Sequence, residues 1–195
     1  MPRKHEADAI KEINHMKKPT RLVALLTLIA IIFTFAVAAG AADPPKVGDK
    51  APSVTGKNQD GKTWKLSDHL GKEVVLLYFY PRDDTPGCTK QACGLRDRME
   101  ELKKDKVEVV GVSFDSAESH QKFIAKHNLN FTLLADTDGK IADAYGVRRE
   151  PGKNMARRAS FLIGLDGKIA HVTDVPSADV HLAEMKEAVA KLPKK

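Results

Sequence analysis

Apolar residues are arranged along this chain in two alternating patterns, short continuous runs and stretches in which they recur every three or four positions. Continuous runs rich in β-branched and aromatic residues are typical of strands buried on both faces, whereas the three-to-four spacing is typical of amphipathic helices. The runs predict strands over 74–80, 107–113, 131–134, 160–163 and 169–172. The helical spacing predicts helices after 85, from about 116, over 139–145 and over 182–192.

The run from Val74 to Tyr80 leads into a turn that carries Cys88, one of only two cysteines. Pro81 would end the strand ladder, because proline has no backbone N–H to donate. Thr85 is a suitable N-cap and Pro86 a suitable first helical residue. Cys88 then falls in the first helical turn, where the positive end of the helix dipole favours a thiolate.

The helix after Thr85 is predicted to be amphipathic through its apolar positions Ala92, Leu95, Met99 and Leu102. At about 100° per residue, Cys88 projects near the middle of this apolar stripe. Cys93 lies roughly 140° away, toward the charged side. We therefore expect one thiol to face inward and the other outward.

The order of elements predicts a mixed α/β sheet with helices on both faces. Residues 58–62 (NQDGK) indicate a hairpin turn before the 63–66 strand, and residues 165–168 (LDGK) indicate a second one near the end. At 195 residues the chain has room for one domain, which we place at 43–195, and an N-terminal extension over 1–42.

The N-terminal extension is interpreted as an export signal. Residues 22–42 carry no charge and end in the small residues AVAAGAA, which suit cleavage by a signal peptidase. Met16 would give a short basic start and is a candidate true initiator. The alternative is an uncleaved membrane anchor through 22–42. Either way the domain would lie outside the cytosol, and we expect a periplasmic location.

Charge does not indicate a nucleic-acid partner. The chain has 32 Lys and Arg against 26 Asp and Glu, a net charge of +6. Six of the basic and three of the acidic residues precede Asp43, so the domain carries 26 basic and 23 acidic residues, a net +3. A charge that small favours no polyanion.

Two cysteines in an exported protein could form a static disulfide, which is the plain alternative to a redox site. A four-residue gap closes too small a loop to constrain the unfolded chain much, which counts against it. A zinc site is disfavoured, because C-x4-C has the wrong spacing and no further cysteine exists. His120 and His127 share a helix face, but no third ligand is spaced to join them.

Tyr78 to Asp97 reads YFYPRDDTPGCTKQACGLRD, which resembles the peroxiredoxin signature, and within that family the bacterioferritin-comigratory or peroxiredoxin Q group. The resemblance extends from about Lys46 to the C-terminus. It implies a thioredoxin-like fold with extra N-terminal strands. Where the family usually has Glu three residues after the reactive cysteine, this chain has Gln91.

The resemblance also implies the site. Pro81, Thr85 and Cys88 would form a peroxide pocket, with Cys88 as the peroxidatic thiol and Cys93 as the resolving thiol that closes a Cys88–Cys93 disulfide. It further implies an Arg two residues before a Ser–Phe strand start, which matches Arg158; spacing alone does not choose between Arg158 and Arg157.

The function implied is thiol-dependent reduction of hydrogen peroxide and organic hydroperoxides. A thioredoxin-like partner would re-reduce the disulfide. No metal, flavin or haem is required, and we expect a monomer. Two rivals remain: an exported thiol-disulfide oxidoreductase, which normally needs C-x-x-C, and a non-enzymatic exported domain with a structural disulfide.

Overall fold

The fold was obtained as a computed structural model that describes residues 43–192. The predicted export segment, 1–42, lies outside the described residues, as do 193–195. Within 43–192, no helix is both long and apolar enough to cross a bilayer.

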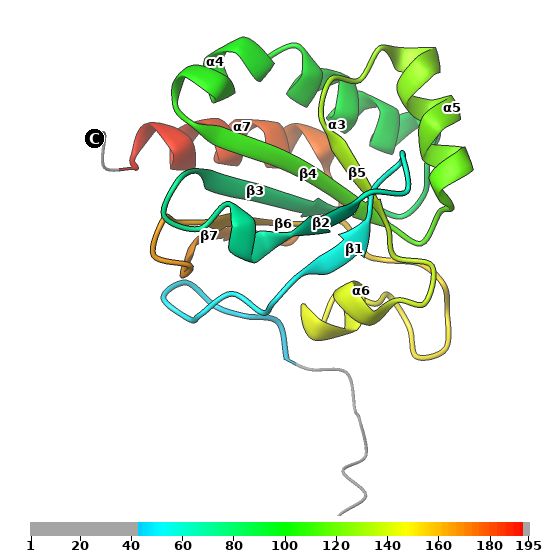
Figure 1. Ribbon diagram of the computed structural model, residues 1–195, viewed down its shortest axis with the longest axis horizontal. Coiled ribbons are helices and arrows are strands. Elements are labelled where there is room, and N and C mark those ends of the chain that lie inside the picture. The colour runs from blue at the N-terminus through cyan, green and yellow to red at the C-terminus, as the bar shows by residue number, and fades with distance from the viewer. Residues whose placement is uncertain (1–42, 193–195) are drawn as a thin grey trace, which may run out of the picture. The chain divides into compact units, whose positions relative to one another are not determined.

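A five-stranded mixed sheet forms the centre of the domain (Figure 1). Its strands are β3 (Val74–Phe79), β4 (Val107–Ser113), β5 (Thr132–Ala135), β6 (Ala159–Ile163) and β7 (Ile169–Thr173), in the order β5-β4-β3-β6-β7. β3 pairs parallel with β4 and antiparallel with β6, and β4 pairs parallel with β5. The predicted strands and the mixed sheet are confirmed.

β3 occupies the centre because it is apolar on both sides. All six of its residues are buried. Alternate side chains enter different cores, with Leu76 and Tyr78 on one face of the sheet and Leu77 and Phe79 on the other. Tyr80, just past the strand, continues the Leu76–Tyr78 side.

Helices cover both faces, as predicted. Figure 1 shows α3 (Pro86–Arg96), α4 (Met99–Lys104), α5 (Ala117–His127) and α7 (Ala178–Ala190) on one side of the sheet. On the other side lie α6 (Lys140–Ala144) and a hairpin of β1 (Thr55–Lys57) and β2 (Thr63–Lys65), followed by the 3-10 helix η2 (Leu66–Asp68). This is a thioredoxin-like fold with an additional N-terminal hairpin.

The cysteine-bearing helix is shorter than its apolar spacing predicts. The buried stripe runs on through Leu95, Met99 and Leu102, but the helix is interrupted between Arg96 and Met99. There the backbone N–H of Arg98 bonds the Leu95 carbonyl in a 3-10 turn, and the Arg98 Nη1 donates to the carbonyl of Leu182 on α7 at 2.7 Å. The break thus coincides with a contact to the distant helix α7.

Candidate active site

Cys88 lies in the first turn of α3, where β3 delivers the chain through a short loop. Pro86 is the first helical residue, as predicted. The Cys88 side chain is only 2 % exposed and packs with Tyr78, Tyr80 and Ala92 on the α3 side of the sheet. Its thiol is free, so the structure shows the reduced form.

A guanidinium group lies against the Cys88 sulfur. Arg158 Nη2 is 3.5 Å from Cys88 Sγ, and Arg158 Nη1 donates to the Oε1 of Gln91 at 2.5 Å. Its third nitrogen, Nε, donates to the carbonyl of Pro176 at 2.9 Å. Three partners in different directions fix the plane of the guanidinium and hold its positive charge beside the sulfur.

Gly87 makes room for that guanidinium. A Cβ at this position would lie 3.1 Å from Arg158 Nη2, a tight contact that the guanidinium would have to relieve by moving a few tenths of an ångström. The glycine of the TPGC sequence therefore lets Arg158 approach the start of α3 without that shift.

The neighbouring arginine points elsewhere. Arg157 pairs with Asp174 at 2.8 Å and donates to the carbonyl of Gly146. Arg158 immediately precedes β6, where Ser160 lies opposite Tyr78 and Ala159 opposite Phe79. The strand alternation thus sends Arg158 to the cysteine side, and geometry separates two arginines that spacing alone could not.

Gln91 is the buried partner of Arg158. Its side chain, 1 % exposed, lies on α3 one turn after Cys88. A neutral amide accepts the guanidinium hydrogen bond here, without the negative charge that a glutamate would bring. Gln91 therefore does not neutralise the positive charge of Arg158, which can act on the Cys88 sulfur.

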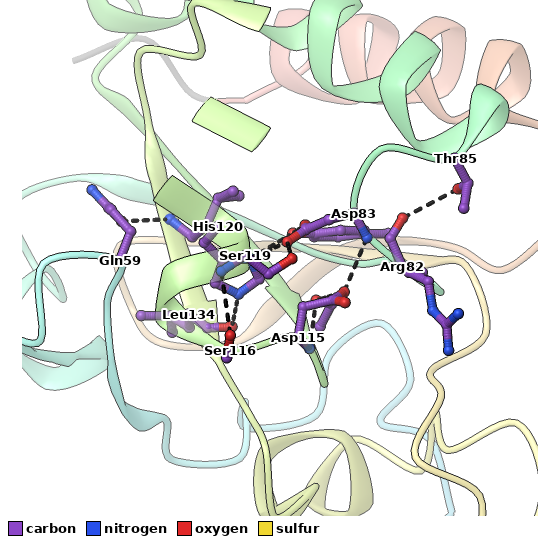
Figure 2. A network of polar contacts seen from close by, with 12 residues as sticks. Gln59, Arg82, Asp83, Thr85, Asp115, Ser116, Ser119, His120 and Leu134 are labelled. Atoms are coloured by element: carbon purple, nitrogen blue, oxygen red, sulfur yellow. Dashed lines mark hydrogen bonds and ion pairs between the residues drawn. The ribbon is translucent and has the colours of Figure 1, made fainter. Parts of the chain in front are cut away.

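Thr85 stands at the N-cap position of α3, but its side chain makes no capping hydrogen bond to the first turn. Instead the hydroxyl donates to the carbonyl of Arg82 at 3.1 Å, as Figure 2 shows. Capping by the Thr85 oxygen, the expected role of an N-cap threonine, is therefore wrong for this structure. The N–H groups in the first turn of α3 remain available to stabilise an anion at this end of the helix. Pro81 is half-buried directly after β3 and Tyr80.

Cys93 lies on the same helix and is partly exposed, whereas Cys88 is buried, so the predicted inward and outward orientations are confirmed. In a regular α-helix, Cα atoms five residues apart are roughly 8 to 9 Å from each other. That exceeds the limit of about 7 Å for a disulfide, so the two thiols cannot bond while α3 is intact.

A histidine behind Arg158 was not expected from the sequence. His181 of α7 is buried; its Nε2 donates to the carbonyl of Val175 at 2.8 Å, and its Nδ1 accepts from the hydroxyl of Ser160 at 2.8 Å. Burial lowers the pKa of His181, and the nearby Arg158 charge adds to this against the opposing bond to Val175. Through its bond to Val175, the neutral His181 ring fixes the backbone next to Pro176. The carbonyl of Pro176 in turn accepts the hydrogen bond from Arg158 Nε. Residues 21 positions apart gave no sequence signal for this pair.

The described residues do not gather as a metal site. Within 43–192, no three His, Cys, Asp or Glu side chains come together in a way that could hold an ion. An apolar hollow between α3, α4 and α7 is lined by Leu95, Leu102 and Met185 among others, and it includes neither cysteine.

Known proteins are similar to this chain over most of the domain. The family model described as the AhpC/TSA family matches residues 47–172. Peroxiredoxin Bcp of Escherichia coli is 50 % identical over 137 residues, 68 % of this chain and 87 % of that protein. Peroxiredoxin Bcp of Bacillus subtilis is 40 % identical over 155 residues, 77 % of this chain and 98 % of that protein.

Solved structures match as well. Peroxidoxin BcpB from Mycobacterium tuberculosis superposes with a TM-score of 0.72 at 33 % identity, covering 76 % of this chain and 99 % of that one. A bacterioferritin comigratory protein from Xanthomonas campestris, described for its alkyl peroxide reduction activity, gives a TM-score of 0.63 at 28 % identity and covers 74 % and 98 %.

Proposed function

This chain belongs to the AhpC/TSA family, the peroxiredoxins, and on that premise we propose that it reduces hydrogen peroxide and organic hydroperoxides with Cys88 as the nucleophile and Cys93 as the resolving thiol. The observation that carries the proposal is the Arg158 guanidinium 3.5 Å from the buried Cys88 sulfur at the start of α3. The alkyl peroxide activity described for the Xanthomonas relative supports the wider peroxide range.

In the first step the Cys88 thiolate attacks one oxygen of the peroxide. An S–O bond forms and the O–O bond breaks; the departing alkoxide or hydroxide takes a proton and leaves as alcohol or water. Arg158 and the first-turn N–H groups of α3 would stabilise the charge that develops on the oxygens. The Thr85 hydroxyl, whose proton is donated to the Arg82 carbonyl, would accept a hydrogen bond from the peroxide, and Pro81 would exclude bulk water from the sulfur.

In the second step the Cys93 thiolate attacks the sulfur of the Cys88 sulfenic acid. The Cys88–Cys93 disulfide forms and the hydroxyl leaves as water. Because intact α3 keeps the thiols apart, this step requires the start of α3 to unwind. A dithiol reductant of the thioredoxin type then transfers two electrons to the disulfide and restores both thiols.

The site of action in this proposal is outside the cytosol. The uncharged segment 22–42 with its small-residue end supports export to the periplasm, and the family match begins only at residue 47. Retention of 22–42 as an anchor is the alternative form, with the domain on the same side of the membrane.

The deciding experiment follows peroxide consumption by the purified reduced protein with a small dithiol as reductant. We expect one peroxide to be consumed for each dithiol oxidised, and this consumption to be lost in Cys88→Ser. Mass spectrometry after one equivalent of peroxide should show the loss of two hydrogens as Cys88 and Cys93 join. Reduction of protein disulfides without peroxide consumption would indicate the rival thiol-disulfide oxidoreductase, and neither activity would indicate a binding domain.

A further inference from the structure

Two adjacent aspartates before the cysteine helix each contact one histidine of α5. Asp83 Oδ2 is 2.9 Å from His120 Nδ1, and Asp84 Oδ1 is 2.8 Å from His127 Nε2. The histidines are two helical turns apart. Asp84 has a left-handed backbone with φ 57°, which turns its carboxylate away from that of Asp83.

The Asp83–His120 pair is buried. The side chain of His120 is 0 % exposed and that of Asp83 is 5 % exposed. The pair lies between α5 and the end of β3, beside the loop that leads to α3 (Figure 2). A buried ion pair is costly to form and is retained only where its hydrogen bonds are well satisfied.

The hydrogen bonds hold Asp83 in its ionised form. Burial alone would raise the Asp83 pKa, but hydrogen bonds from His120, Tyr80 and Ser119 outweigh it and hold that pKa below its usual value. On the other side of the ring, His120 Nε2 lies 3.1 Å from the carbonyl of Leu134, so both ring nitrogens have partners.

The Asp83 residue is held from several directions at once. Its carboxylate accepts from the Tyr80 hydroxyl at 2.7 Å and from the Ser119 hydroxyl at 2.7 Å, and its backbone N–H donates to Asp115 Oδ2 at 2.9 Å. A hydrogen-bond network of this kind holds the loop before α3 in a single conformation.

The conformation of this loop determines where Thr85 and the first turn of α3, which carries the reactive cysteine, are placed. The Thr85 hydroxyl donates to the carbonyl of Arg82, the residue directly before Asp83. Four residues separate Asp83 from Cys88, and two of them, Thr85 and Pro86, form the start of α3. A shift of Asp83 would displace both the Thr85 hydroxyl and the first helical turn.

We propose that the buried Asp83–His120 pair is a positioning device, which fixes residues 81–85 against α5 so that Thr85 and the first turn of α3 meet the peroxide at Cys88. The inference rests on the proposed peroxidase function. Neither residue touches the reacting atoms; misplacement of catalytic groups by about 1 Å can cost on the order of a hundred-fold in rate.

The principal test is Asp83→Ala in the reduced domain, measured in a single turnover with hydrogen peroxide. We expect the rate constant for oxidation of Cys88 to fall at least about ten-fold per folded molecule. Alkylation of Cys88 by iodoacetamide, which needs the thiolate but not the peroxide-binding geometry, should stay the same or become faster. A merely structural role would lower the unfolding temperature and leave the peroxide rate of the folded fraction unchanged.

The matched control is Asp84→Asn, because Asp84 is the adjacent loop residue, its pairs with His127 and Lys126 are solvent-exposed, and Asn tolerates the left-handed backbone. Its peroxide rate should remain that of the native protein. A rate for Asp83→Ala equal to the native rate would overturn the inference, as would an equal loss in Asp84→Asn.

If Asp83→Ala does not fold, Ser119→Ala removes one of the hydrogen bonds to the Asp83 carboxylate and takes its place. It should slow Cys88 oxidation about two- to five-fold; an unchanged rate would overturn the inference. A native protein that does not react with peroxide at all would refute the proposed function instead, so the two failures are distinguishable.

Discussion

Arg158 donates a 2.5 Å hydrogen bond from Nη1 to the Oε1 of the buried Gln91, while its other terminal nitrogen lies beside the Cys88 sulfur. The first prediction is that Gln91→Glu slows the reaction of Cys88 with peroxide. A carboxylate at position 91 would compete for the guanidinium and repel the thiolate, reducing the thiolate present near neutral pH by on the order of ten-fold.

Ultraviolet absorbance of the thiolate, titrated in both proteins, would measure this effect, and single-turnover kinetics would measure its consequence. An equal or larger thiolate fraction in Gln91→Glu would contradict the proposed role of the neutral amide.

The second prediction separates the two thiols. Cys93→Ser should oxidise once at the native rate, because Cys93 takes no part in the attack on peroxide, and then accumulate as a Cys88 sulfenic acid or over-oxidise. Trapping with a sulfenic-acid reagent, followed by mass spectrometry, would locate the product. A slow first turnover in Cys93→Ser with a native rate in Cys88→Ser would reverse the assignment.

The third prediction is that oxidation melts the start of α3. The disulfide cannot form within the helix, so the oxidised protein should lose helical structure from about Pro86 to Leu95. Amide hydrogen exchange of residues 88–96 in the two redox forms would report this. Equal protection in both would leave an intermolecular disulfide as the route.

The fourth prediction concerns pH. Since burial lowers the pKa of His181, the unfolded chain binds a proton near pH 6.5 that the folded protein does not accept until a lower pH. Folded stability should therefore decrease as pH falls below about 6.5 and stop decreasing below the folded pKa. His181→Gln should lack this component. Urea unfolding of the native protein and of His181→Gln at several pH values would measure the free energy of unfolding of each. If the two free energies change with pH in the same way, the His181 pKa is not lowered by folding.

The fifth prediction concerns the N-terminal extension. The mature protein should begin between about Ala39 and Asp43, where small residues suit a signal peptidase. N-terminal sequencing of the natural protein decides this. Recovery of intact residues 16–45 in a membrane fraction would instead support the anchor.

Much of the fold could be predicted from the sequence because local pattern and tertiary environment agree there. Val107–Ser113 is a mostly apolar run, interrupted by Glu108, and forms a strand with those bounds, and the 165–168 turn joins β6 to β7 as expected. The helix break at Asp97–Arg98 could not be predicted. It involves neither Gly nor Pro, and the bond that Arg98 makes there reaches Leu182, 84 residues away.

The site was predictable only in part for the same reason. The family resemblance pointed to Cys88, Thr85 and Arg158, whereas only the structure separates Arg158 from Arg157 and shows that Pro176 holds the Arg158 guanidinium beside Cys88. His120 and His127 looked like a weak metal pair on the sequence, yet in the structure each contacts an aspartate of the cysteine loop. Gly94 leaves room for Leu182, since a Cβ there would lie 2.4 Å from Leu182 Cδ1.

His127 contacts the chain on both sides of α3, through its ring to Asp84 and through its carbonyl to Arg96 Nη1 at 2.6 Å. When the helix unwinds, the residues between these two anchors become a short tether with both ends fixed. Thiols on a short flexible tether meet at an effective concentration of roughly millimolar. A cysteine on a second molecule would have to reach that concentration to compete for the Cys88 sulfenic acid, so the anchors favour an internal disulfide over a crosslinked dimer.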